Sequence, residues 1–170
     1  MEKDISRLKE TDLFKNLTPE QIGKVLHICR TVTFSENEII MKEGDVGDRM
    51  YIIREGTVEV IKKLIMDGMD DEESAGKNKV FTRLDAGQHA VFGEIALLEE
   101  LKRTATVRTI TDCTLYEIKK EGFLNLAEKD FELGYRVLLN LSRIVSTRLR
   151  KANEDTIKLT TVLSMILKES

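Results

Sequence analysis

Along the first 29 residues, apolar side chains recur three or four positions apart, which is the spacing of one face of a helix. The pattern is interrupted once, at residues 16–19. There, Thr18 is followed by Pro19 and Gln21, the order expected for a helix N-cap, a proline in the first turn and a capping-box partner. The pattern therefore predicts a pair of N-terminal helices, the second of which begins at Pro19.

From residue 30 to residue 118, apolar positions alternate with polar ones, which predicts short β-strands. The clearest signal lies at residues 50–61, where two alternating runs flank residues 54–56 and predict a hairpin with a positive φ at Gly56. Further strands are predicted at residues 30–34, 38–41, 79–84, 104–110 and 113–118. Short strands that follow one another closely predict an antiparallel sandwich or barrel rather than a parallel sheet with crossover helices.

Residues 62–78 interrupt the strand pattern with a polar and acidic stretch, where we expect a long mobile loop. Asp67, Asp70 and Asp71 lack the spacing of a calcium-binding loop. The whole chain has only two histidines and two cysteines. The sequence therefore predicts no metal site.

From about residue 121 to the end, the spacing is helical again. Between residues 131 and 167, nine positions form a heptad-like seam, and six of them are large or aliphatic residues: Leu138, Ser142, Val145, Leu149, Ala152, Thr156, Leu159, Leu163 and Ile166. The seam predicts a helix that packs against a partner, either a second copy of the chain or the chain's own strands. Residues 153–156 could also cap a new helix, so one helix or two are expected.

Composition and charge narrow the class of protein. The chain has 170 residues, of which 41% are hydrophobic and 34% charged, and this suits a single compact domain. Its net charge of −3 lacks the basic excess of most nucleic-acid binders. No apolar run is long enough to cross a bilayer and residues 1–10 are charged, so we expect a cytoplasmic protein with reduced thiols at Cys29 and Cys113.

The densest chemical signal lies between residues 92 and 107. Gly93 opens a short helical stretch, at whose start the backbone N–H groups lack partners within the helix and can bind an anion. Glu94 follows directly, and Arg103 comes nine residues later. A ligand that meets all three features needs an anionic group for the guanidinium and a hydroxyl donor for the carboxylate, and a cyclic 3′,5′-nucleotide has both. The spacing alone leaves one alternative open, a surface ion pair between Glu94 and Arg103.

Residues 92–98, Phe-Gly-Glu-Ile-Ala-Leu-Leu, and residues 103–107, Arg-Thr-Ala-Thr-Val, resemble the phosphate-binding cassette of the cyclic nucleotide-binding domain family. That family includes the catabolite activator protein and the regulatory subunits of cyclic-AMP-dependent protein kinase. Residues 39–53 also resemble the family's glycine-rich turn and hairpin, and Gly56 stands at the position of its hairpin-turn glycine. The likeness spans residues 10–152.

The resemblance implies an α+β, mainly β fold: an antiparallel β-roll, or double-stranded jelly-roll barrel, with N-terminal helices and one or two long C-terminal helices. It implies that Glu94 binds the ribose hydroxyl and that Arg103 binds the phosphate. Further ligand contacts are implied for the backbone of Gly93, Ile95 and Ala96, the small Ala105 beside the phosphate, the hydroxyl of Thr104, and the base-facing Asn153.

The sequence departs from the family pattern in two places that bear on this site. Lys102 stands where many relatives have a proline just before the arginine. Five residues separate Gly87 from Gly93, where relatives commonly have three. We expect the longer segment to form a bulge that could tilt Glu94.

We therefore expect a non-enzymatic receptor for a cyclic nucleotide, with cyclic AMP preferred to cyclic GMP. Residues 1–130 are expected to form the binding roll with its N-terminal helices, and residues 131–170 a helical lid or dimerisation segment without a helix-turn-helix domain. Ligand binding is expected to move the C-terminal helices against a partner protein or a second copy, with no nucleic acid, membrane or metal involved. The alternatives are a degenerate roll that serves as an interaction scaffold, and a truncated transcription regulator.

Overall fold

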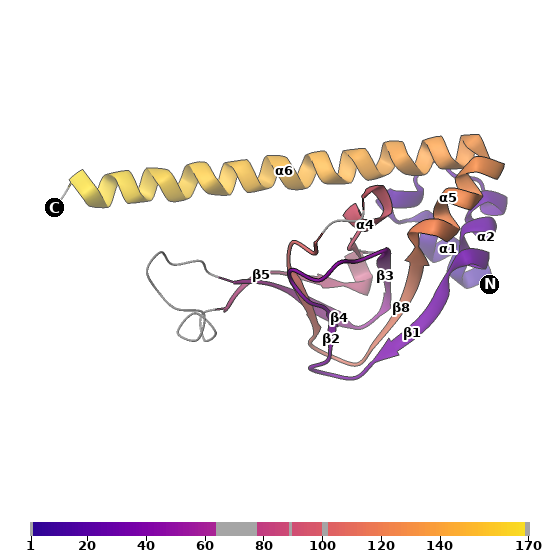
Figure 1. The fold of residues 1–170 in the computed structure, drawn as a ribbon, viewed down its shortest axis with the longest axis horizontal. Helices are drawn as coiled ribbons and strands as arrows, with labels where there is room; N and C mark the ends of the chain where they lie inside the picture. The colour runs from indigo at the N-terminus through magenta and orange to yellow at the C-terminus, as the bar shows by residue number, and fades with distance from the viewer. Residues whose placement is uncertain (1, 64–77, 89, 100–101, 169–170) are drawn as a thin grey trace.

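The computed structural model describes residues 2–63, 78–88, 90–99 and 102–168, and Figure 1 shows their arrangement. The N-terminal region forms helix α1 (Glu2–Lys9), the short helix η1 (Asp12–Phe14) and helix α2 (Pro19–Ile28). The Thr18 side chain accepts a hydrogen bond from Gln21 N (3.2 Å), and the Gln21 side chain accepts one from Thr18 N (3.0 Å). The predicted capping box is confirmed, as is the start of a second helix at Pro19.

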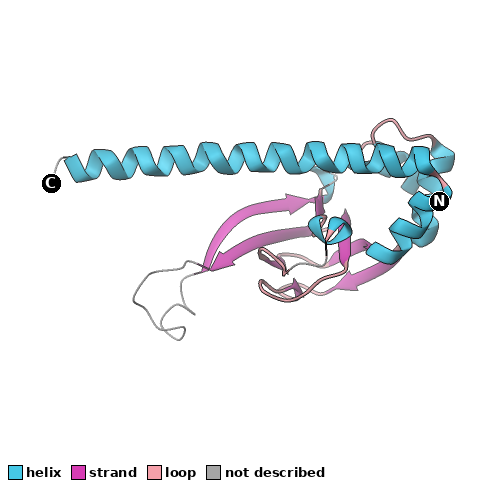
Figure 2. Cartoon of the chain, turned by 45° about the horizontal axis from the view of Figure 1, so that its top comes forward, coloured by secondary structure: helices cyan, strands magenta, loops and turns pink. Residues whose placement is uncertain are grey.

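The strands of the described chain form two four-stranded antiparallel sheets, which Figure 2 shows below the long helix. In chain order the strands are β1 (Arg30–Phe34), β2 (Ile39–Met41), β3 (Arg49–Glu55), β4 (Thr57–Lys63), β5 (Asn78–Asp85), β6 (Val91–Phe92), β7 (Thr106–Thr109) and β8 (Cys113–Lys119). One sheet has the order β1-β8-β3-β6 and the other β2-β7-β4-β5. The predicted α+β fold with an antiparallel β-roll is confirmed.

The predicted hairpin at residues 50–61 is wrong in its pairing. Gly56 has the expected positive φ of +93°, and both flanking strands form. However, β3 pairs with β8 and β6, whereas β4 pairs with β7 and β5. The turn therefore carries the chain from one sheet to the other, because alternation predicts strands but not their partners. Most of the predicted loop, residues 64–77, lies outside the described residues; Lys62 and Lys63 belong to β4 and Asn78 to β5.

Strand β3 separates two parts of the hydrophobic core, because its side chains alternate between the two faces of the sheet. Met50 and Ile52 lie in the cluster that joins the roll to the helices. Tyr51 lies in the cluster that fills the roll, and its ring stacks on Phe92 with the ring centroids 5.2 Å apart. One face of this sheet therefore supports the helices, and the other lines the interior of the roll.

The chain continues with η2 (Ala86–Gln88) and α4 (Ile95–Leu98), and after β8 with α5 (Lys120–Lys129) and α6 (Phe131–Lys168). Helix α6 is continuous through residues 153–156, where Thr156 Oγ1 donates to Ala152 O (2.9 Å). There is thus one long helix in this region rather than two. Its 38 residues give a length of roughly 57 Å, and Figure 1 shows it running beyond the roll.

The first half of α6 is fixed to the N-terminal helices. Leu133, Val137 and Leu141 are buried in the cluster shared with α1, η1 and α2. Asn140, which is also buried, donates hydrogen bonds to the backbone carbonyls of Leu13 (3.1 Å) and Lys15 (2.8 Å). In the residues that the structure describes, no helix is both long enough and apolar enough to cross a membrane.

Candidate functional site

Glu94 and Arg103 lie in the segment between β6 and β7, and both are buried. Glu94 is 4% exposed and Arg103 is 9% exposed. No salt bridge between described residues joins them. The surface ion pair that the spacing left open is therefore wrong, because both charged groups have been removed from water.

The chain reaches Glu94 through a turn that requires glycine. Gly93 has a φ of +70°, and a Cβ at this position would lie 2.8 Å from Arg103 Nη1 and 3.2 Å from Arg49 O. In the helix that follows, Ala96 N donates to Gly93 O (3.1 Å). This N–H therefore finds its partner outside α4 (Ile95–Leu98), in the turn that precedes the helix.

The turn at residues 44–47, before β3, fixes the backbone of Arg103. The Arg103 N–H donates to Asp45 O (2.7 Å), and the Arg103 carbonyl accepts from Gly44 N (2.9 Å). Gly47 leaves room for the side chain, since a Cβ there would lie 2.1 Å from Arg103 Nε. The upstream glycine-rich segment therefore places the arginine, although nearly sixty residues separate the two in sequence.

Among described residues, the Arg103 guanidinium donates only to backbone carbonyls: Nη1 to Gly93 O (3.3 Å) and Nη2 to Arg49 O (2.7 Å). It forms no salt bridge with a described carboxylate. Burial lowers the pKa of Arg103, because removal from water disfavours the charged form. Buried charges in proteins are normally paired, so this guanidinium is suited to receive an anionic group.

A second cation beside Arg103 already has its counter-ions. Arg49 Nε donates to Asp48 (2.9 Å) and Arg49 Nη1 donates to Glu117 (3.0 Å), and these carboxylates raise the pKa of Arg49. Glu117 is buried, and its Oε1 has no hydrogen-bond partner in the described chain. Sequence reasoning missed Arg49 and Glu117 because they meet only through the pairing of β3 with β8.

Glu94 is paired with a residue of α6 that sequence reasoning also missed. Arg148 Nη1 lies 2.6 Å from Glu94 Oε2, and Arg148 Nη2 donates to Val91 O (2.6 Å). The long helix is therefore tied to the carboxylate that the family resemblance assigns to the ribose. The apolar seam in the sequence gave no sign of this contact, because Arg148 lies outside it.

The other predicted site residues differ in exposure. Ala96 and Ala105 are buried, as a close approach of ligand to backbone requires. Ile95, Thr104 and Asn153 are exposed. The structure thus brings the small residues of the cassette close to the interior and leaves the base-facing candidate on α6 open to solvent.

The end of the segment between Gly87 and Gly93 continues the sheet. Val91 and Phe92 pair with β3 as strand β6, and Ile53 N donates to Ala90 O (3.0 Å). His89 lies outside the described residues. The strand therefore delivers Glu94 to a buried position despite the longer connection.

Among the residues that the structure describes, no group of three or more histidine, cysteine, aspartate or glutamate side chains is placed to hold a metal ion. Cys29 and Cys113 are both free thiols. Burial raises the pKa of Cys29 to about 12, so its thiol is a poor nucleophile at neutral pH.

Comparison with known proteins identifies the part of the chain that contains Glu94 and Arg103. Residues 31–130 match the family model of the cyclic nucleotide-binding domain. Among curated proteins, the chain is 32% identical over 114 residues to a cGMP-dependent protein kinase of Drosophila melanogaster, and 31% identical over 119 residues to the cAMP-dependent protein kinase regulatory subunit of Blastocladiella emersonii. These matches cover 67% and 70% of this chain, but only 9% and 27% of the two relatives.

Solved structures give the same result. The catabolite activator protein of Thermus thermophilus superposes with a TM-score of 0.73 and 25% sequence identity. The match covers 88% of this chain and 63% of that protein. The chain therefore corresponds to one part of each of these longer relatives.

Proposed function

Because the chain belongs to the cyclic nucleotide-binding domain family, we propose that it is a receptor for a cyclic 3′,5′-nucleotide, with cyclic AMP preferred to cyclic GMP. The observation that carries the proposal is the buried Arg103 guanidinium, which has backbone carbonyls but no described carboxylate as partners. A singly charged cyclic phosphate supplies the missing counter-ion. The family is a binding domain, so catalysis is not part of this proposal.

The ligand contacts follow the cassette. Arg103 binds the phosphate, Glu94 binds the ribose hydroxyl, and the ring lies against the small side chains of the cassette. We assign the remaining contacts to the backbone of Gly93, Ile95 and Ala96, to Ala105 and Thr104, and to Asn153 at the base. The preference for cyclic AMP rests on its frequency among family ligands, because a hydroxyl at Thr104 accommodates either base.

Coupling to the rest of the molecule passes through Arg148. The ribose hydroxyl and the Arg148 guanidinium both require Glu94, so ligand binding competes with the ion pair that ties α6 to the cassette. A ligand shifts such an equilibrium only by its differential affinity for the two states, and this competition provides the difference. In this proposal residues 1–130 are the binding unit and residues 131–170 the responding helical segment.

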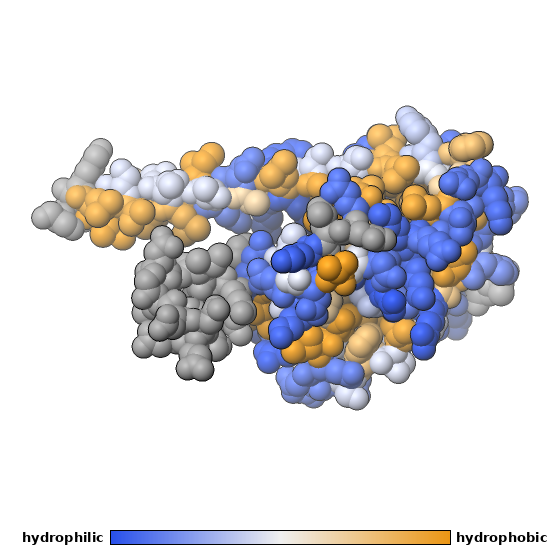
Figure 3. Space-filling model, viewed as in Figure 1, coloured by the Kyte–Doolittle hydropathy of each residue, from blue (hydrophilic) through white to orange (hydrophobic). Residues whose placement is uncertain are grey.

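The responding segment also presents a surface for a partner. Figure 3 shows apolar residues gathered along the distal part of α6, and Leu159 and Leu163 of the seam are 65% and 56% exposed. An apolar seam at heptad spacing is suited to packing against a second helix. We assign this surface to a second copy of the chain, in the reducing compartment that free Cys29 and Cys113 favour.

Isothermal titration calorimetry with cyclic AMP and cyclic GMP tests the proposal. The wild type is expected to bind both ligands, cyclic AMP more tightly. Replacing Arg103 by alanine should weaken binding by about 2–5 kcal/mol, because the ligand phosphate loses a charge-assisted pair. Arg150→Ala, at an exposed position on α6, should leave the affinity unchanged.

Undiminished affinity in the Arg103→Ala variant would show that the site is misassigned. If neither nucleotide binds the wild type, or raises its unfolding temperature at millimolar concentration, the chain is instead an interaction scaffold or part of a DNA-binding regulator.

A further inference from the structure

A second cation lies beside Arg103 at the phosphate end of the proposed ligand site. Arg49 begins strand β3 two residues before Tyr51, so both side chains leave the strand on the same face, and Tyr51 belongs to the cluster that fills the roll. The backbone carbonyl of Arg49 accepts from Arg103 Nη2 (2.7 Å). Burial is the main cause that lowers the pKa of Arg103, and the like charge of Arg49 lowers it as well. An anion that binds Arg103 therefore also lies within the field of Arg49.

The charge of Arg49 is already balanced by two carboxylates. Its Nε donates to Asp48 (2.9 Å) and its Nη1 to Glu117 (3.0 Å). The two carboxylates differ in burial, because the Asp48 side chain is 52% exposed and the Glu117 side chain only 6%. Water screens an exposed charge far more than a buried one. Glu117 is therefore the carboxylate that offsets Arg49 in the interior of the roll.

Glu117 faces this interior. It stands directly opposite Tyr51 in the pairing of β3 with β8, and such partners share one face of a sheet. Arg49 binds its Oε2, whereas the buried Oε1 has no hydrogen-bond partner in the described chain. Burial is the main cause that raises the pKa of Tyr51, and the Glu117 charge raises it further. The carboxylate therefore acts on groups across the roll interior, and not on Arg49 alone.

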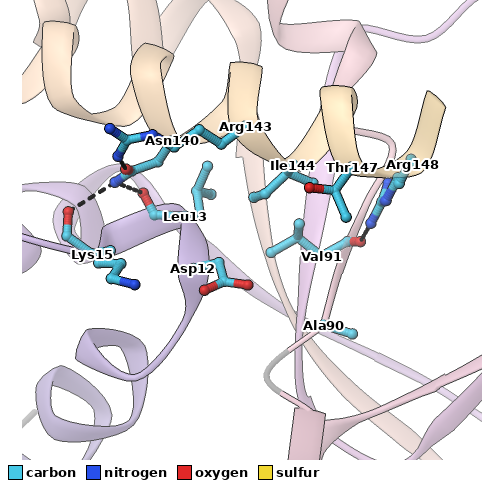
Figure 4. A pocket seen from close by; sticks show the side chains of 10 residues that line it. All are labelled: Asp12, Leu13, Lys15, Ala90, Val91, Asn140, Arg143, Ile144, Thr147 and Arg148. Atoms are coloured by element: carbon cyan, nitrogen blue, oxygen red, sulfur yellow. Dashed lines mark hydrogen bonds between the residues drawn. The ribbon is translucent and has the colours of Figure 1, made fainter. Parts of the chain in front are cut away.

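Arg148 and Lys102 also lie close to the cassette, but neither adds a buried charge without a partner. Arg148 reaches from α6 to Val91 O, as Figure 4 shows, and its Nη1 lies 2.6 Å from Glu94 Oε2. Lys102 is exposed, so water screens its charge. Among these described cations, only Arg103 is both buried and without a carboxylate partner.

We propose that Glu117 makes the site selective for a singly charged cyclic phosphate over a doubly charged phosphate monoester, because it offsets Arg49 and leaves Arg103 alone to balance the ligand. This selectivity, which rests on the proposed function, distinguishes a cyclic nucleotide from its hydrolysis product. When water opens the ring, one P–O bond breaks, the hydroxyl goes to phosphorus and the proton to the released alcohol. The monoester that forms ionises a second time with a pKa of about 6. At neutral pH its extra negative charge is repelled by Glu117, so the site favours the closed ring.

Calorimetry on the full chain at pH 8 tests this selectivity with three probes: cyclic AMP, 5′-AMP and the methyl ester of 5′-AMP. The methyl ester is acyclic like 5′-AMP but singly charged like cyclic AMP, so it separates the effect of charge from that of ring shape. The wild type should bind the methyl ester more tightly than 5′-AMP. A probe that binds too weakly for direct titration is measured by its displacement of cyclic AMP.

Glu117→Gln keeps the size of the side chain and an oxygen for Arg49 but removes the negative charge. The affinity for 5′-AMP should rise about tenfold relative to both singly charged probes, because electrostatic repulsion grows with the charge of the ligand. The double variant Arg49→Gln/Glu117→Gln removes one charge of each sign and should return this ratio toward the wild-type value, which a merely structural role of Glu117 would not produce. Glu128→Gln, at an exposed position on α5, should leave all three affinities unchanged.

An unchanged ratio in Glu117→Gln, or no measurable binding of 5′-AMP to this variant, would overturn the role of Glu117. Equal affinity of the wild type for the two acyclic probes would overturn it as well, even if the variant does not fold. A double variant that keeps the ratio of Glu117→Gln would overturn the part of Arg49. If cyclic AMP binds the wild type and the ratios do not move, the proposed function stands without this selectivity; if no cyclic nucleotide binds, the proposed function itself fails.

Discussion

At the scale of single residues, the position of Arg103 depends on two glycines that come from different parts of the chain. Gly93 leaves space on one side of the guanidinium and Gly47 on the other. A Cβ added at either position would lie less than 3.0 Å from a guanidinium nitrogen, so any side chain there displaces the guanidinium. At Gly47 the added atom would meet only the arginine side chain, whose end moves at little cost, so the effect there is expected on ligand binding more than on folding.

Gly47→Ala provides the test. The new Cβ would lie 2.1 Å from Arg103 Nε and must push the guanidinium away from the carbonyls that orient it. The affinity for cyclic AMP, measured by calorimetry, should fall at least tenfold, while the unfolding temperature changes little. Gly23→Ala, where no atom lies within 4 Å of the added Cβ, is the matched control. Unchanged affinity in Gly47→Ala would contradict the assigned role of this glycine.

The sequence revealed some residues of the site and missed others. The two groups differ in whether local sequence or tertiary contacts position them. Glu94 and Arg103 were identified because both belong to one contiguous segment with a recognisable order. Arg49, Glu117 and Arg148 reach the same site from β3, β8 and α6. Their contribution depends on strand pairing and on where a helix crosses the roll, and neither is visible in local spacing.

At the scale of elements, α6 is held at its beginning by apolar packing and at the cassette by a single ion pair among described residues. Arg148 is the residue that connects the helix to Glu94. When Arg148 is replaced by an uncharged residue, the ligand hydroxyl no longer competes with a guanidinium for the Glu94 carboxylate. Only molecules in which the ion pair is open can bind the ligand through Glu94. The apparent affinity for the ligand therefore falls as the fraction of molecules with a closed ion pair rises.

Arg148→Gln should consequently raise the affinity for cyclic AMP several-fold in calorimetry. Hydrogen exchange of backbone amides beyond residue 145 should become faster without ligand, because the helix has lost its anchor. Arg150→Gln, which lies close by on the same helix and is exposed, should change neither quantity. Weaker binding by Arg148→Gln would show that this arginine supports the ligand instead of competing with it.

The junction between α5 and α6 carries a pH-dependent contact. Asp130 accepts from Lys24 Nζ (2.9 Å) and from Leu133 N (3.1 Å), and the Lys24 hydrogen bond is the main cause that lowers the pKa of Asp130. Since the folded-state pKa lies below the ordinary value of 3.8, the contact stabilises the fold at higher pH. This contribution is lost as the pH falls through the folded-state value.

Asp130→Asn should therefore lower the unfolding temperature at pH 7, and this loss should shrink as the pH falls toward 2 and Asp130 becomes protonated. Thermal melts across this range measure the difference. Glu128→Gln, an exposed position on α5, serves as the control. An equal decrease in unfolding temperature at both pH values would show that the charge of the Asp130 side chain does not contribute to stability.

At the scale of the whole molecule, helix α6 has a first part that packs against the core and a distal part that is exposed. Leu133, Val137 and Leu141 in its first three turns belong to the core, whereas large apolar residues from Leu149 onward are more than half exposed. Figure 1 shows this distal part beyond the roll. An exposed helix of this kind is stabilised when a second helix packs against its apolar seam.

Sedimentation equilibrium should show a dimer for the wild type, and Leu159→Glu/Leu163→Glu should shift it to a monomer by placing like charges in the seam. Thr161→Glu, outside the seam, should leave the dimer intact. A monomeric wild type at micromolar to millimolar concentration would contradict the assigned partner.

The sequence by itself determined the kinds of element, the capping box at Thr18, the turn at Gly56 and the two charged residues of the cassette. Each depends on neighbours within a few turns of chain, where spacing fixes which side chains share a face. Tertiary structure alone decided that β3 and β4 belong to different sheets, and that Glu94 is paired with Arg148. Those outcomes depend on contacts between distant segments, which form only when the core closes.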